Sequence, residues 1–80
     1  MRIRVMYFAS YRELTGLTEE DVQIAEGSTV EALMAIIKER HEPLRDAGNA
    51  LVAVNSEFGR PEDILSEGDV VALFPPVSGG

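Results

Sequence analysis

The chain has 80 residues, which is enough for one small domain. Its hydrophobic fraction of 45% and charged fraction of 26% are ordinary for a globular protein. A net charge of −7 disfavours binding to the phosphates of nucleic acids. No apolar run approaches the roughly 18 residues of a membrane span, and the N-terminus lacks the apolar segment of a signal peptide. We therefore expect a cytoplasmic protein that binds neither nucleic acid nor membrane.

The chain lacks the side-chain motifs that catalysis usually needs. It contains no cysteine, which removes thiolate nucleophiles and cysteine-based metal sites. The single histidine, His41, has no metal-site spacing around it, and we interpret it as a residue at a helix end. No phosphate-binding or dinucleotide-binding glycine motif occurs. We therefore expect no activity from this chain alone, no metal site and no permanently bound cofactor.

The first half of the chain predicts two strands and two helices. Residues 2–8 and residues 21–24 alternate between two faces, as strands do. Residues 10–13 match a capping box that would begin a short helix, and residues 28–31 match a second one. Apolar side chains then follow at helical spacing at Val30, Leu33, Met34 and Ile37, which predicts the main helix, and Pro43 marks its end.

The second half predicts strands that are apolar throughout. Residues 51–54 and 70–74 are continuous apolar runs, a pattern typical of strands covered on both faces. A short strand lies between them, and residues 55–61 hold turn residues around Phe58. Pro75 and Pro76 end the last strand because they cannot donate backbone hydrogen bonds. The last strand would be buried if it lay in the centre of the sheet, parallel to the first strand. These elements predict an α+β fold of the β-grasp type, with a mixed sheet of four to five strands and one main helix.

The C-terminal end is the strongest candidate for a functional site. Residues 1–74 form the predicted β-grasp domain, and residues 75–80 form a predicted flexible tail that ends in Gly79 and Gly80. Two terminal glycines occur by chance in roughly one chain in 200. A tip without side chains can enter a narrow channel, where another enzyme could activate its carboxylate as an acyl-adenylate. Taken alone, the dipeptide is equally compatible with an idle, frayed terminus.

Several different short motifs follow one another along the whole chain. They are Phe8-Ala9 with Arg12-Glu13-Leu14 and Gly16; residues 29–33; residues 53–55; Gly68-Asp69 with Val71-Ala72; and residues 74–80. The last, Phe-Pro-Pro-Val-Ser-Gly-Gly, is the most specific, and residues 55–65 match least well. Together they resemble the small subunits of molybdopterin synthase, a ubiquitin-like family of sulfur carriers with the β-grasp fold.

The resemblance implies that Gly80, preceded by Gly79, is the carrier residue. A ubiquitin-activating-like adenylyltransferase would adenylate its carboxylate with ATP and Mg²⁺, and sulfur would then replace AMP to give a thiocarboxylate. The thiocarboxylate would donate sulfur to cyclic pyranopterin monophosphate, making molybdopterin for the molybdenum cofactor. The large subunit of molybdopterin synthase would supply the catalytic side chains within a heterotetramer.

The resemblance also implies a partner-binding surface. Apolar side chains at Phe8, Phe58 and Phe74 would dock on the activating enzyme and the large subunit. Composition alone favours a place in the core for all three rings, whereas the resemblance favours the surface for Phe8 and Phe74 and leaves Phe58 open. The tail residues that would enter the large subunit are Pro75, Pro76, Val77 and Ser78, with the two glycines.

Three other functions remain compatible with the sequence. The chain could carry sulfur for another route, such as the synthesis of thiamine or the thiolation of tRNA. It could be a ubiquitin-like modifier that is joined to lysines of other proteins through Gly80. It could also be an interaction domain with an idle terminus.

Overall fold

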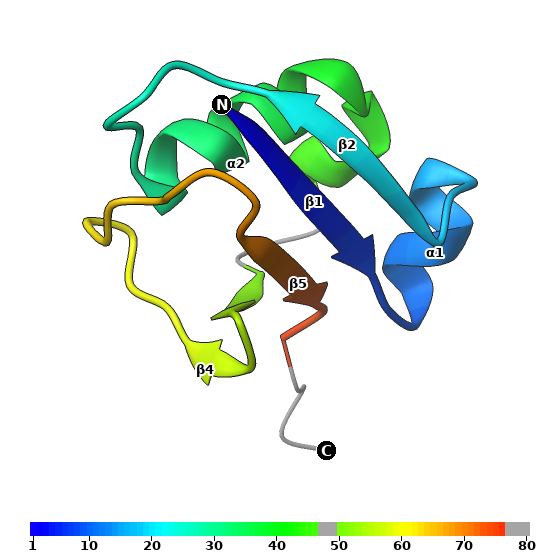
Figure 1. Cartoon of the computed structure of the whole chain (residues 1–80). Coiled ribbons are helices and arrows are strands. Elements are labelled where there is room, and N and C mark those ends of the chain that lie inside the picture. Colours follow the sequence, from blue (N-terminus) through cyan, green and yellow to red (C-terminus); the bar gives the residue numbers. More distant parts are fainter. Residues whose placement is uncertain (47–49, 77–80) are drawn as a thin grey trace.

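A mixed five-stranded sheet forms one layer of the molecule, and its central strand is the last one in the chain. In the computed structural model, which describes residues 1–46 and 50–76, the strand order is β2-β1-β5-β3-β4. The strands are β1 (Arg2–Tyr7), β2 (Glu19–Gln23), β3 (Leu51–Val54), β4 (Glu57–Phe58) and β5 (Val70–Phe74). β5 runs parallel to β1 and antiparallel to β3 (Figure 1). The predicted β-grasp topology is confirmed.

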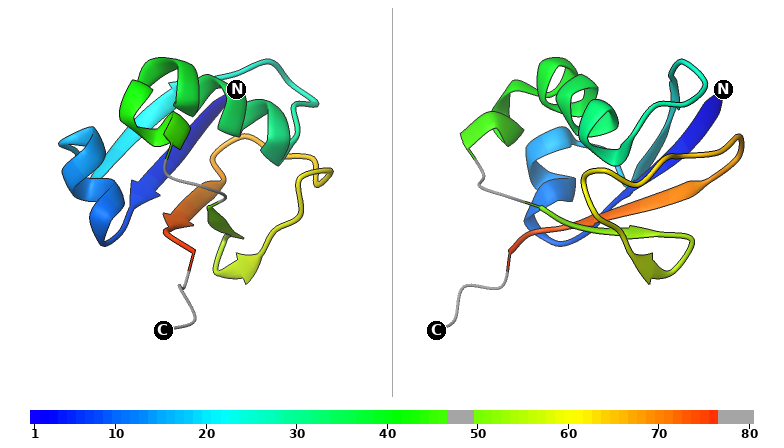
Figure 2. Two further views of the ribbon diagram at one scale, coloured as in Figure 1. Left: turned by 180° about the vertical axis from the view of Figure 1, so that it is seen from behind. Right: turned by 90° about the vertical axis from the view of Figure 1, so that its left-hand side faces the viewer.

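The helices form the second layer. They are α1 (Ser10–Thr15), α2 (Val30–Arg40) and the 3-10 helix η1 (Glu42–Asp46). All of them lie on one side of the sheet, as the two views in Figure 2 show. In the described residues, no helix is long and apolar enough to cross a membrane.

The main helix begins one residue later than the capping box suggests. Thr29 is the N-cap, and its hydroxyl accepts a hydrogen bond of 3.2 Å from the N–H of Ala32. The hydroxyl of Ser28 instead donates to the carbonyl of Ala25 at 2.6 Å. The helix ends at His41, whose N–H donates to the carbonyl of Ile37, so the prediction of a helix-end histidine is confirmed.

The capping box predicted at residues 10–13 is wrong. Ala9 is the N-cap of α1 and makes no side-chain hydrogen bond, while Ser10 is already inside the helix. The chain turns sharply here, with φ 52° at Ala9 and a hydrogen bond of 3.1 Å from the N–H of Tyr11 to the carbonyl of Phe8. A backbone turn therefore does what the hydroxyl was expected to do.

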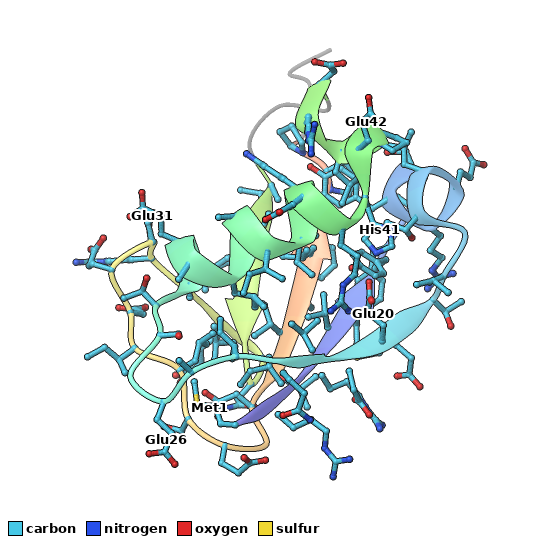
Figure 3. All side chains as sticks on the ribbon, turned by 90° about the horizontal axis from the view of Figure 1, so that it is seen from above. Met1, Glu20, Glu26, Glu31, His41 and Glu42 are labelled. Atoms are coloured by element: carbon cyan, nitrogen blue, oxygen red, sulfur yellow. The ribbon has the colours of Figure 1, made fainter. Side chains whose placement is uncertain are left out.

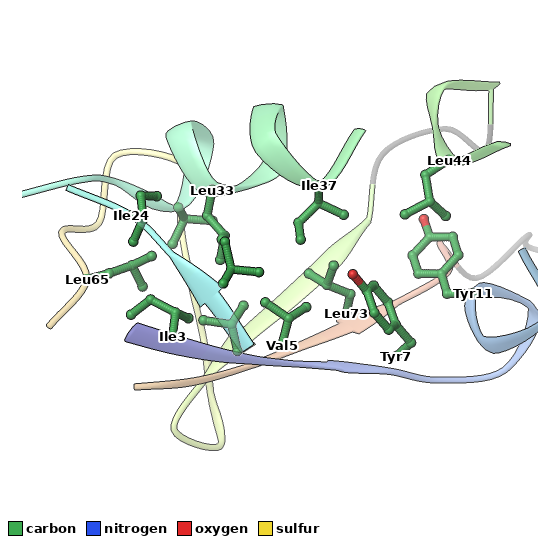
Figure 4. Close-up of a cluster of buried hydrophobic side chains, with 13 residues drawn as sticks. Ile3, Val5, Tyr7, Tyr11, Ile24, Leu33, Ile37, Leu44, Leu65 and Leu73 are labelled. Atoms are coloured by element: carbon green, nitrogen blue, oxygen red, sulfur yellow. The ribbon is translucent and has the colours of Figure 1, made fainter. Parts of the chain in front are cut away.

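The core fills the space between α2 and the inner face of the sheet (Figure 4). Its fully buried members, at 0% exposure, come from both layers: Ile3, Val5, Val22, Leu33, Ile37, Val71 and Leu73. Truncating a buried leucine in such a setting costs about 2–5 kcal/mol. This packing makes the domain a rigid support for whatever its outer face presents.

The expectation that the apolar strands are covered on both faces is wrong. Val71 and Leu73 of β5 are fully buried, but their neighbour Phe74 is only half-buried. Leu51 of β3 is 41% exposed. The helices pack on one face only, so the alternate side chains of these strands face outward although they are just as apolar.

A polar cluster closes one end of the core. The carboxylate of Glu20, on β2, accepts hydrogen bonds from the hydroxyl of Tyr7, from Nε2 of His41 and, at 2.8 Å, from Arg40. Its side chain is 14% exposed. Figure 3 shows Glu20 on β2 beside His41 at the end of α2. The cluster ties the edge strand β2 to the C-terminal end of α2.

The same contacts shift two pKa values. Burial by itself would raise the pKa of Glu20, but hydrogen bonds from Tyr7, Arg40 and His41 outweigh it, and the pKa of Glu20 is lowered. Burial, together with the hydrogen bond to Glu20, raises the pKa of the Tyr7 phenol. The folded state therefore favours a charged Glu20 beside a neutral Tyr7.

Acid should weaken the contribution of Glu20 to stability. Because its folded pKa is lowered, that contribution is complete above the unfolded value of about 4.3 and is lost as the pH falls through the folded pKa. At pH 7, Glu20→Gln should lower the free energy of unfolding by about 2 kcal/mol in urea denaturation. The deficit should shrink below pH 4, and the exposed control Glu26→Gln should change stability by less than about 0.5 kcal/mol. A deficit that stays constant down to pH 2 would contradict this role.

Candidate docking surface and carrier terminus

Two aromatic rings meet on the outer face of the sheet. β1 and β5 are parallel neighbours in register from Arg4 to Tyr7, so the residues after Tyr7 and Leu73 come side by side. Here Phe8 and Phe74 stack with ring centroids 4.6 Å apart and an interplanar angle of 12°. Both are half-buried. The two positions that the sequence assigns to a surface are thus brought together on it.

The stacked pair forms one wall of an apolar hollow of about 450 Å³. The hollow crosses four strands and the β3–β4 turn, and its lining residues are Met6, Phe8, Ala53, Asn55, Ser56, Phe58, Val70, Ala72 and Phe74. Phe58, which the sequence assigned neither to the core nor to the surface, is 83% exposed. An exposed aromatic ring beside a hollow is typical of a docking site. We call these lining residues the outer hollow.

Arg12 forms a charged rim beside the stacked rings. Its Nε donates a hydrogen bond of 2.9 Å to the carbonyl of Tyr7, and its guanidinium lies 5.4 Å from the centroid of the Phe8 ring. Arg12 is an exposed residue of α1. The sequence motif around Phe8 contains this arginine, but only the turn at Ala9 brings the two side chains together.

A second hollow, of about 520 Å³, lies on the other side of Phe58. Residues of α2 and β3 line it, including Met34, Lys38 and Leu51. Although it is larger, neither Phe8 nor Phe74 lines it. The outer hollow is the better candidate because the chain leaves β5 directly from it.

The tail begins at the edge of the outer hollow. Pro75 is half-buried and Pro76 is exposed, and neither belongs to a strand. The other predicted site residues lie outside the described residues, and they are Val77, Ser78, Gly79 and Gly80. The predicted tail of residues 75–80 is therefore described only at its root. In residues 1–46 and 50–76, no group of three or more acidic or histidine side chains could hold a metal ion.

The chain matches a known protein family over nearly its whole length. The model of the ThiS family matches residues 5–80. The chain belongs to this family. Two relatives are each named molybdopterin synthase sulfur carrier subunit. The protein of Chlamydomonas reinhardtii is 41% identical over 83 residues, with 100% of both chains covered. That of Escherichia coli (strain K12) is 42% identical over 81 residues, with 98% of this chain and 99% of its own covered.

Several similar proteins of known structure have the same fold. The putative molybdopterin converting factor, subunit 1, of Pyrococcus furiosus has a TM-score of 0.89 at 35% identity and covers 95% of this chain and 98% of its own. SAMP1 of Haloferax volcanii has a TM-score of 0.87 at 28% identity, with full coverage of both. A chain in the complex of subunits 1 and 2 of the molybdopterin-converting factor from Helicobacter pylori has a TM-score of 0.71 at 25% identity, again with full coverage.

Adjacent residues of β5 should differ sharply in their effect on folding. Leu73 is fully buried, so Leu73→Ala should lower the free energy of unfolding by about 2–5 kcal/mol. Phe74→Ala removes a half-buried ring and one stacking contact, and we expect a loss of about 1 kcal/mol. Urea denaturation of both variants measures the difference. Equal losses would put Phe74 in the core and would remove the basis for a docking surface.

Proposed function

We propose that this chain is the sulfur carrier subunit of a molybdopterin synthase and serves molybdenum cofactor biosynthesis. The observation that carries the proposal is its similarity, from end to end, to proteins of that name at 41% and 42% identity. The similarity extends through the Gly79-Gly80 end, because the family match runs to residue 80. Fold alone would not support a function, since β-grasp domains serve many.

The geometry of the described residues supports a carrier that its partner enzymes recognise through the surface of the domain. β5 delivers the chain to Phe74 in the outer hollow, and residues 75–80 follow it. Six residues span at most about 20 Å when fully extended. An enzyme that docks on the outer hollow therefore meets Gly80 within that distance. The domain fixes where the carboxylate is delivered, and the partner supplies the chemistry.

The chemistry concerns the Gly80 carboxylate. One carboxylate oxygen attacks the α-phosphorus of ATP, and pyrophosphate leaves, which gives an acyl-adenylate. Hydrosulfide from the sulfur source then attacks the acyl carbon and AMP leaves, so that a thiocarboxylate forms without a change of oxidation state. Its sulfur is passed to cyclic pyranopterin monophosphate, and two carriers supply the two sulfur atoms of molybdopterin. Gly79 and Gly80 add no side chain that could obstruct either transfer.

Two protein partners follow from this sequence of reactions. A ubiquitin-activating-like adenylyltransferase holds the ATP and Mg²⁺, and the large subunit of molybdopterin synthase receives the thiocarboxylate. The complex of subunits 1 and 2 from Helicobacter pylori supports the second partner. We propose that Phe8, Phe58 and Phe74 dock on both, that residues 75–80 enter them, and that the complete synthase is a heterotetramer with two carriers on a large-subunit dimer.

A ubiquitin-like modifier is the second candidate. The observation in its favour is the similarity to a solved chain from Haloferax volcanii whose name is small archaeal modifier protein 1, with a TM-score of 0.85 at 26% identity. In this alternative the activated Gly80 acylates a lysine amine instead of receiving sulfur. Sulfur delivery to thiamine or tRNA would use the same thiocarboxylate with another acceptor.

Mass spectrometry of the intact protein tests the carrier chemistry. Incubation with ATP, Mg²⁺, the activating enzyme and a sulfur source should add about 16 Da, the difference between sulfur and oxygen. Subsequent addition of the large subunit and cyclic pyranopterin monophosphate should return the mass to its starting value and yield molybdopterin. A stable gain without molybdopterin would favour another sulfur acceptor, and adducts on lysines of other proteins would favour a modifier. No gain at all would refute every carrier function.

Deletion of Gly80 should separate function from folding. The core cluster extends from Ile3 to Leu73, so removal of the last residue should leave the melting temperature within about 1 °C of the full-length protein. The mass gain should disappear, because the new terminus is too short for the activating site. Gly80→Ala keeps the length but adds a methyl group, and we expect a slower gain. An unchanged gain in the deletion variant would contradict a role for Gly80.

A further inference from the structure

The turn between β3 and β4 has an unusual backbone. Asn55 and Ser56 connect the two strands, and both have positive φ, 51° and 73°. A two-residue hairpin turn of type I′ requires this at both positions. Asparagine tolerates it, but glycine is the usual second residue and serine is strained there. The turn therefore needs support from the rest of the molecule.

Asn55 supplies that support through three hydrogen bonds to the start of β5. Its Oδ1 accepts from the N–H of Val70 at 3.0 Å, and its Nδ2 donates to Oδ1 of Asp69 at 2.9 Å. Its own N–H donates to the carbonyl of Val70 at 2.8 Å. The amide thus pairs with both the backbone and a carboxylate across the strand end. We call these three bonds the Asn55 clamp.

Asp69 connects the clamp to the rest of the sheet. Its other carboxylate oxygen, Oδ2, accepts from the N–H of Ser66 at 2.8 Å, and its carbonyl accepts from the N–H of Arg4 at 3.0 Å. Asn55 and Asp69 are 14 positions apart and belong to separate sequence motifs, yet their side chains are hydrogen-bonded to each other.

The clamp controls a segment that has little other support. β4 pairs with β3 through only two residue pairs, Ala53 with Phe58 and Val54 with Glu57. One further backbone bond, 2.8 Å from the N–H of Gly59 to the carbonyl of Val52, follows. The Phe58 ring, at 83% exposure, is held mainly by its backbone. Its orientation over the outer hollow depends on the turn that precedes it.

We propose that Asn55 is a positioning residue for docking, which holds Phe58 in the orientation that the large subunit of molybdopterin synthase binds. The inference rests on the proposed function, because that function supplies the partner. Asn55 lines the outer hollow itself but acts through Phe58. Preorganisation of this kind raises affinity because the loop does not have to be ordered on binding.

A double-mutant cycle tests the proposal. The variants are Asn55→Ala, Phe58→Ala and the two combined, and the measurement is the Kd for the large subunit. We expect Phe58→Ala to weaken binding about 10–30-fold and Asn55→Ala about 5–10-fold. In the Phe58→Ala background, Asn55→Ala should add less than about twofold. An equal loss in both backgrounds would overturn the proposal, because Asn55 would then act independently of Phe58.

Asn55→Gly and one control variant separate the two side-chain bonds of the clamp from the backbone conformation of the turn. Asn55→Gly keeps the positive φ without strain but removes the amide, so it should weaken binding as Asn55→Ala does. The control Ser66→Ala removes an exposed hydroxyl that does not line the outer hollow and keeps the backbone N–H that donates to Asp69, so it should bind as tightly as the natural protein. Natural affinity in Asn55→Gly would overturn a role for the clamp.

A measurement without the partner keeps the proposal testable if the proposed function fails. Amide hydrogen exchange at Gly59 reports the opening of the hairpin, because its N–H is bonded to Val52. Exchange there should be at least about fivefold faster in Asn55→Gly and unchanged in Ser66→Ala. Faster exchange with no binding to the large subunit would refute the proposed function but would support the role of the clamp in holding the hairpin. Unchanged exchange in Asn55→Gly would overturn the clamp even if the carrier chemistry holds.

Discussion

The structure depends on the insertion of β5 between β1 and β3. This strand is the last in the chain, yet it pairs with the first one in parallel and with β3 in antiparallel orientation. Val71 and Leu73 point from it into the core and are fully buried. The domain cannot close its core until its C-terminal strand is in place. The segment that follows Phe74 is consequently attached to the most constrained strand of the sheet.

The same strand makes the outer face apolar. Phe74 points away from the helices and stacks on Phe8. Phe8 directly follows the last residue of β1, the strand that pairs with β5. A sheet covered on one face normally alternates apolar and polar side chains, and β1 does so at Arg2 and Arg4. β5 does not, which is why its outer side contributes to a hollow. Exposing apolar side chains to water is unfavourable, and such a face is typical of a protein that buries it against a partner.

Polar contacts at the two ends of the sheet have different consequences. Glu20, with Tyr7 and His41, joins an edge strand to the main helix within a partly buried cluster, so its effect is on stability. Asn55 and Asp69 join two strand ends at the surface beside Phe58, so the proposed effect is on recognition. Each contact fixes an element that backbone pairing alone holds weakly, namely the edge strand β2 and the two-residue strand β4.

The sequence by itself determined the element order and the β-grasp topology, because alternation, helical spacing and prolines are local patterns. It also predicts the terminus as the functional site. Only the tertiary structure decided that the apolar strands are open on one side, since that depends on where the helices pack. It also decided the exposure of Phe58 and the contact between Asn55 and Asp69. These depend on a backbone turn with positive φ and on the pairing of distant strands, and no local pattern encodes either.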